Sequence, residues 1–98
     1  AGITTASDKK LKENIESTPV RALDKINVLN LVAFDYIKDK THEEIGLIAQ
    51  EVQDIIPSAV LDDGNDSYLS IQYSKFVPYL IKAVQELHKK IEKLEKIA

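Results

Sequence analysis

The most regular pattern of apolar positions lies at the C-terminal end of the chain. Apolar side chains alternate there at intervals of three and four, at Val77, Leu80, Val84, Leu87, Ile91, Leu94 and Ala98. This is a heptad repeat with apolar a and d positions, and it predicts a long helix over 74–98 that forms a coiled coil. The stripe narrows to a and d after Val84, which favours self-association over packing on the chain's own domain. Valine and isoleucine at a with leucine at d nominally favour a dimer.

The remainder of the chain predicts short elements of both kinds. After the start signal Ser17-Thr18-Pro19, we expect a helix over about 19–29, followed by a strand over 31–37 and a polar loop over 38–44. Residues 45–48 are expected to form a strand or the entry to a buried helix, and a helix over 50–56 should end at Pro57. The last short element is a β-hairpin over 59–71 with its turn at 62–66. The predicted fold class is therefore α+β. A small globular part with short strands and a β-hairpin precedes a long C-terminal α-helix.

Composition narrows the classes of function. The chain has 98 residues, 44% hydrophobic and 30% charged, which is enough for one small globular domain. A net charge of −3 argues against general nucleic-acid binding, and no apolar run approaches a membrane span. There is no cysteine and only two histidines, so we expect no metal and no cofactor. There is also no methionine, which favours a piece of a longer protein.

Most candidate chemistry is weak. The chain has no nucleophile elbow, no His-Glu-x-x-His motif and no glycine-rich phosphate loop. The acidic turn around Gly64 lacks the spacing of a calcium loop, and His42 and His88 have no evident ligand partners. One arrangement remains, in which Ser7 precedes three closely spaced lysines. A serine can act as a nucleophile when a neutral lysine accepts its proton, although a serine before a charged run more often caps a helix.

Several segments together resemble one known family. They are Ser7-Asp-Lys-Lys-Leu-Lys-Glu-Asn-Ile15, Gly46-Leu-Ile-Ala-Gln-Glu-Val52, Pro57 with Val60, Tyr73, and the run from Leu80 to Leu87. They occur in the order and with the spacing of the peptidase S74 family, the C-terminal intramolecular chaperone domains of phage endosialidases, tail fibres and neck appendages. Related domains occur in myelin regulatory factor transcription factors. The resemblance covers residues 7–98.

The resemblance implies a homotrimeric, self-cleaving domain. It would hold the chains of an upstream β-rich stalk of the same polypeptide in register while they fold, and then cleave itself off between Ala6 and Ser7. Ser7 would be the nucleophile and Lys12 the general base of a Ser-Lys dyad. Because the family is trimeric, we expect a three-stranded coiled coil through Val77, Leu80, Val84, Leu87, Ile91 and Leu94.

The spacing of Ser7 and Lys12 sets a geometric condition. Residues i and i+5 lie about 140° apart on a helix and on opposite faces of a strand. The two side chains therefore meet only if a turn intervenes or if the pair forms between protomers. The second arrangement would give a reason for cleavage to wait for assembly.

These expectations divide the chain into three parts. Residues 1–6 would be the remnant of the stalk, 7–73 the globular chaperone and cleavage region, and 74–98 the oligomerisation helix. We expect the domain to act in the cytoplasm of an infected bacterium during virion assembly, with no nucleic acid, membrane or small-molecule substrate as partner, and to be released from a virion tail or appendage precursor. The alternatives are a non-catalytic oligomerisation module in which Ser7 only caps a helix, or the equivalent domain of a membrane-tethered transcription factor.

Overall fold

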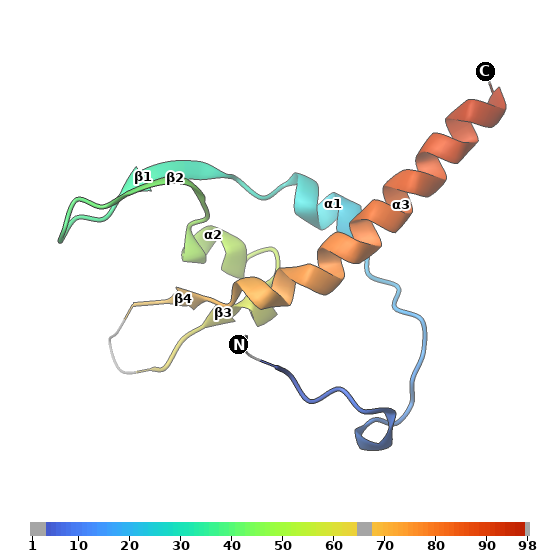
Figure 1. Cartoon of the computed structure of the whole chain (residues 1–98), viewed down its shortest axis with the longest axis horizontal. Helices are drawn as coiled ribbons and strands as arrows, with labels where there is room; N and C mark the ends of the chain where they lie inside the picture. The colour runs from blue at the N-terminus through green and yellow to red at the C-terminus, as the bar shows by residue number, and fades with distance from the viewer. Residues whose placement is uncertain (1–3, 65–67, 98) are drawn as a thin grey trace.

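The computed structural model describes residues 4–64 and 68–97, and it confirms the α+β class (Figure 1). Two antiparallel strand pairs and three helices follow an extended N-terminal arm, with short 3₁₀ turns between them. In chain order the elements are η1 (Lys9–Leu11), α1 (Ala22–Asn27), β1 (Val32–Asp35), β2 (His42–Gly46), α2 (Ala49–Gln53), η2 (Pro57–Ala59), β3 (Val60–Leu61), β4 (Ser70–Ile71), η3 (Tyr73–Lys75) and α3 (Phe76–Ile97). Within the described part of the chain, no helix is both long and apolar enough to cross a membrane.

A small core forms where α2, η2 and the first turn of α3 meet. Val52, Ile56 and Ala59 are fully or almost fully buried, and Phe76 closes the cluster from α3. Helix α2 ends at Gln53, before the predicted end at residue 56, and Pro57 instead opens η2, where its missing N–H costs little. A core of this size buries little apolar surface, so a single copy of this domain is marginally stable. The same core fixes the start of α3, the element that carries the heptad stripe.

Helix α1 begins later than the sequence predicts. We expected a start near residue 19, capped by Ser17 or Thr18, but the helix begins at Ala22 and no neighbouring side chain caps it. The Thr18 hydroxyl instead accepts a hydrogen bond from the Val20 N–H at 3.2 Å. The N–H groups of Ala22 and Leu23, in the first turn of α1, donate hydrogen bonds to the Glu86 carboxylate on α3, at 2.8 and 3.2 Å. A cap supplied from 64 residues away is invisible to a local pattern.

The segment predicted as a polar loop is partly a strand. Residues 42–44 belong to β2, which pairs antiparallel with β1 and places His42 opposite Asp35. Both faces of this hairpin are largely open to solvent, so β2 lacks the alternation of apolar and polar residues that identifies a strand. The turn between the strands is closed by a hydrogen bond from the Tyr36 N–H to the Thr41 carbonyl, at 2.9 Å.

The predicted hairpin over 59–71 and the long helix are present. Strands β3 and β4 pair Val60 with Ile71 and Leu61 with Ser70, as expected for a hairpin over 59–71. Residues 65 and 66 of its predicted turn lie outside the described residues, as does Ala98, the last a position. Helix α3 packs on α1 at its N-terminal half and then extends past the body of the domain (Figure 1).

The N-terminal arm, residues 4–20, leaves the body next to α3, runs outward as far as η1 and reverses direction there (Figure 1). Every residue from 4 to 19 is exposed, including two large apolar side chains, Leu11 at 71% and Ile15 at 64%. The hydrogen bonds within residues 7–12 are all local. The arm carries the residues that the sequence singles out for chemistry.

Candidate active site

A single tight turn in the arm brings the two candidate catalytic residues together. Residues 9–11 form a 3₁₀ turn, in which the Leu11 N–H donates to the Asp8 carbonyl at 3.0 Å and the Lys12 N–H to the Lys9 carbonyl at 3.1 Å. The turn lies between Ser7 and Lys12 in the chain. The Lys12 Nζ donates a hydrogen bond to the Ser7 Oγ at 2.7 Å.

This contact decides between the two arrangements that the spacing allows. A turn intervenes, and the two side chains meet within one chain. The hypothesis that the Ser7–Lys12 pair has to form between protomers therefore loses its basis. The atoms in contact are those that a Ser-Lys dyad uses, the nucleophilic oxygen and the nitrogen that would take its proton.

The alternative role for Ser7, that of a helix cap, is filled by its neighbour. The Asp8 carboxylate accepts a hydrogen bond from the Lys10 N–H at 2.8 Å and so caps the 3₁₀ turn. The sequence interpretation of Ser7 as a cap placed this role one residue too early. Aspartate is among the strongest capping residues, so the type of residue at position 8 was the available signal.

Both members of the pair are open to solvent in a single chain. Ser7 and Lys12 are exposed, and so are Ala6 before them and the lysines at 9 and 10. A general base has to be neutral, and removal from water is what favours the neutral form of a lysine. The geometry for proton transfer is therefore in place, but the desolvation that would activate it is not provided by this chain alone.

The two histidines stand apart from this turn. His42 lies between the carboxylates of Asp35 and Glu44, with ring nitrogens 2.6 and 2.9 Å from their oxygens, on the exposed β1–β2 hairpin. His88 pairs with Glu92 one turn further along α3 at 3.4 Å. In the described part of the chain, no group of three or more histidine or acidic side chains is arranged to hold a metal ion.

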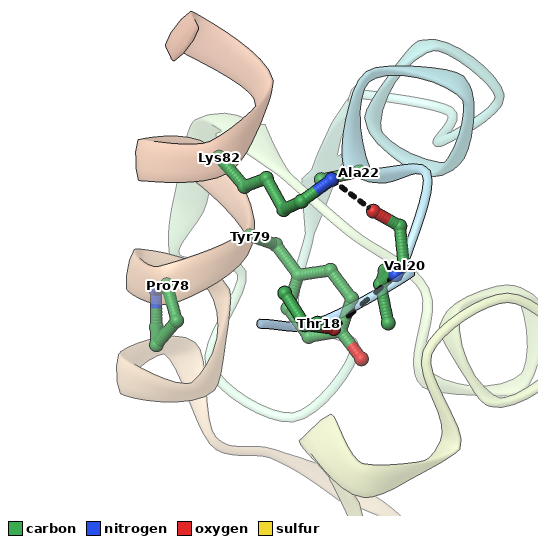
Figure 2. Close-up of a pocket in the computed structure, with 6 residues that line it drawn as sticks. All are labelled: Thr18, Val20, Ala22, Pro78, Tyr79 and Lys82. Carbon is green, nitrogen blue, oxygen red and sulfur yellow. Dashed lines mark hydrogen bonds between the residues drawn. The ribbon is translucent and has the colours of Figure 1, made fainter. Parts of the chain in front are cut away.

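A hollow of about 280 Å³ lies where the arm joins the body (Figure 2). It is lined mostly by apolar surface from Val20, Ala22, Pro78 and Tyr79. Its charged member, Lys82, donates to the Val20 carbonyl and lies 3.5 Å from Glu86. None of its lining residues belongs to the Ser7–Lys12 pair. We therefore assign it to the junction between arm and helix rather than to catalysis.

The predicted oligomerisation residues form an uncovered stripe along α3. Val77, Leu80, Val84, Leu87, Ile91 and Leu94 are between 45% and 66% exposed in the single chain. Ile81, which neighbours this stripe, is 55% exposed and helps line a shallow apolar hollow with Val77, Leu80 and Val84. The stripe is therefore wider at its start than the a/d pattern alone indicates.

Fold and site together define a class of protein: a domain with a small core, a helix whose heptad stripe is uncovered, and a Ser-Lys contact on an extended arm. Residues 7–61 match the peptidase S74 family, described as the chaperone of endosialidase. Because the match spans more than half of the chain, the chain belongs to this family. The family is one of self-cleaving serine peptidases.

Similar proteins come from bacteriophages. The chain is 35% identical over 97 residues to the long tail fiber protein Gp37 of Enterobacteria phage K3 and 36% identical over 97 residues to that of Enterobacteria phage M1, covering 91% of this chain in each case. It spans only 8% of the K3 protein and 38% of the M1 protein. The family description supports a role in chaperoning or assembly.

Proposed function

We propose that this domain trimerises, registers an upstream β-rich tail-fibre stalk of the same polypeptide, and then releases itself by autoproteolysis between Ala6 and Ser7. The observation that carries the proposal is the 2.7 Å contact between Lys12 Nζ and Ser7 Oγ, made within an exposed arm. In this proposal residues 1–6 belong to the stalk, 7–73 form the chaperone and cleavage region, and 74–98 form the oligomerisation helix. Assembly takes place in the cytoplasm of the infected bacterium.

The chemistry is a single turnover on the chain's own backbone. The Ser7 Oγ attacks the carbonyl carbon of Ala6, and Lys12 Nζ takes the hydroxyl proton. The Ala6–Ser7 C–N bond then breaks, and the proton passes to the departing amine of Ser7. The Ala6 carboxyl is held as an ester on Ser7 Oγ until water hydrolyses it, which leaves an Ala6 carboxylate and a free Ser7 hydroxyl. The small side chains at Thr5 and Ala6 leave room for the attack.

Assembly would supply what the single chain lacks. The dyad is exposed, and a neutral lysine requires removal from water. Leu11, beside Lys12, is largely exposed and gives a neighbouring copy an apolar surface to cover. Covering this part of the arm in the trimer would desolvate Lys12, so cleavage follows assembly without any residue being contributed across the interface to the dyad itself.

The chaperone role has a thermodynamic and a kinetic side. Intertwined β-structure has many long-range contacts and is easily trapped in the wrong register. Three chains joined by their heptad helices would hold the attached stalk segments at an effective concentration in the roughly millimolar range. Release of the domain afterwards makes the stalk persistent for kinetic reasons, because it could not refold without its chaperone.

The test is cleavage of the chain expressed with its upstream stalk. We expect Ser7→Ala and Lys12→Ala each to reduce release of the domain by at least about a hundredfold, followed on denaturing gels with N-terminal sequencing of the fragment. Lys12→Arg should be equally inactive, because arginine keeps the charge but does not give up its proton. Lys9→Ala is the matched control and should cleave like the wild type.

Two results would contradict the proposal. If Ser7→Ala and Lys12→Ala still release a fragment that begins at residue 7, the dyad is wrong. If the wild type assembles but never cleaves, the domain is a non-catalytic oligomerisation module. The upstream sequence tests the remaining alternative, since a DNA-binding domain there would indicate a transcription factor, although the similarity to tail-fibre proteins favours a phage fibre.

A further inference from the structure

The turn that joins Ser7 to Lys12 has few sources of stability. It contains no buried residue, and extended chain flanks it on both sides. One helical turn is unstable by itself in water, because it fixes several backbone angles for each hydrogen bond gained. Without a turn, residues five apart in extended chain point to opposite faces. The Ser7–Lys12 contact therefore depends on whatever holds this turn closed.

One side chain is placed to hold it. The Asp8 carboxylate accepts the Lys10 N–H at 2.8 Å, and the carbonyl of the same residue accepts the Leu11 N–H at 3.0 Å. The Asp8 backbone is extended, with φ −63° and ψ 137°, as a capping residue requires. Asp8 thus lies next to Ser7 in sequence and binds the Lys10 and Leu11 N–H groups of the turn that brings Lys12 back to Ser7.

We infer that Asp8 is a positioning residue for self-cleavage, which closes the turn that holds Lys12 Nζ against Ser7 Oγ and touches neither the scissile bond nor the proton in transit. This inference rests on the proposed function. Asp8 would act through the hydrogen bond that its side chain accepts from the backbone, so any side chain with an oxygen acceptor at that position should close the turn. A role through the negative charge of Asp8 on nearby lysines would require a carboxylate.

The two mechanisms separate in a pair of variants. In the full chain with its stalk, Asp8→Ala should slow release of the domain by about five- to tenfold, the population loss that a missing cap causes. Asp8→Asn keeps the acceptor without the charge and should cleave within about twofold of wild type, because asparagine and aspartate cap almost equally well. The pH profile of cleavage should keep its midpoint in both, because the base is unchanged. Glu13→Ala, an exposed carboxylate on the same arm, is the control.

Several outcomes would overturn the inference. They are an Asp8→Ala variant that cleaves at the wild-type rate, an Asp8→Asn variant as slow as Asp8→Ala with a shifted pH midpoint, and an Asp8→Ala variant that no longer assembles. A wild type that does not cleave is a failure of the proposed function instead. In that case the capping role is still measured by amide exchange of Lys10 in the 98-residue chain, which should be faster in Asp8→Ala than in Asp8→Asn. Equal exchange rates in the two variants would overturn it.

Discussion

Gly46, at the end of β2, lies against the ring of Phe34 on the neighbouring strand. A Cβ added at Gly46 would come within 2.7 Å of Phe34 Cε2, which is closer than real contacts allow. The strand pair is already irregular there, with a bulge between Val32 and Phe34. The glycine is therefore needed for close approach of a ring, and not for an unusual backbone angle.

We predict that Gly46→Ala destabilises the domain by about 1–3 kcal/mol, because the Phe34 ring has to move out of its place. Urea unfolding of the protein measures this as a lower midpoint. In a Phe34→Leu background the same substitution should cost much less, since the clashing ring is gone. An equal cost in both backgrounds would contradict the steric explanation.

Gly64 makes the contrasting case. Nothing lies within 4 Å of a Cβ added there, but its φ is +75°, a conformation that costs other residues about 1 kcal/mol. Gly64→Ala should therefore destabilise the protein in either Phe34 background alike, as unfolding curves of the four variants would show.

For single residues, the sequence shows which side chains are candidates for a role better than it shows which groups they contact. The Ser7–Lys12 pair was expected from its resemblance to a family, and the structure adds the turn that makes the contact possible. The capping role of Asp8 and the tight packing of Gly46 were not predicted. Both depend on the backbone path, which one residue's identity does not reveal.

Between elements, the most informative contact joins α1 to α3. The Glu86 carboxylate, on a side chain 26% exposed, accepts two N–H groups at the start of α1 and lies 3.5 Å from Lys82 Nζ. Partial burial by itself would raise the pKa of Glu86. The hydrogen bonds from Leu23 and Ala22 and the charge of Lys82 outweigh it and hold that pKa below its ordinary value.

This lowered pKa predicts a dependence of stability on pH. The stabilisation by Glu86 is present above the ordinary glutamate pKa and is lost as the pH falls through the lower pKa of the folded state. Glu86→Gln should therefore be less stable than wild type at pH 7, and the difference should shrink as the pH falls below the ordinary glutamate pKa, as chemical unfolding at each pH would show. Glu43→Gln, on the exposed hairpin, should have the same stability as the wild type at each pH. Parallel curves for Glu86→Gln and wild type would contradict the assignment.

The accuracy of the predicted elements follows the strength of their local signals. Helix α3 and the β3–β4 hairpin were predicted because heptads and turn residues are local patterns. The start of α1 was predicted wrongly because its cap comes from α3. The first part of β2, residues 42–44, was predicted as loop because neither face of this strand is buried enough to impose an alternating pattern.

For the molecule as a whole, uncovered apolar surface is the main feature. The heptad stripe along α3 is continuous, and the core of one copy is small. Each leucine that becomes buried between helices would contribute about 1.5–3 kcal/mol per copy. The sequence predicts that the chain associates; the number of copies came from the family, since the a/d residues alone favour two.

We predict that Leu87→Asn converts the assembly to monomers and blocks self-cleavage, although Ser7, Asp8 and Lys12 are unchanged. Sedimentation measures the first effect and gel analysis of the stalk-bearing chain the second. Lys89→Asn, on the outer face of the same helix, should leave both unaffected. A Leu87→Asn variant that is monomeric yet cleaves at the wild-type rate would show that assembly does not activate the dyad.

The exposed arm has a consequence for evolution as well as for mechanism. Residues 7–20 could reach up to about 50 Å if fully extended, so under the proposed function the turn that joins Ser7 to Lys12 would not have to lie on the surface of the domain that carries it. A domain that cleaved at this distance would need no shape complementarity to the structure it separates from. Such a domain would be portable: it could be joined to a new fibre without redesign of either part, provided that the arms of the proposed trimer reach the junction.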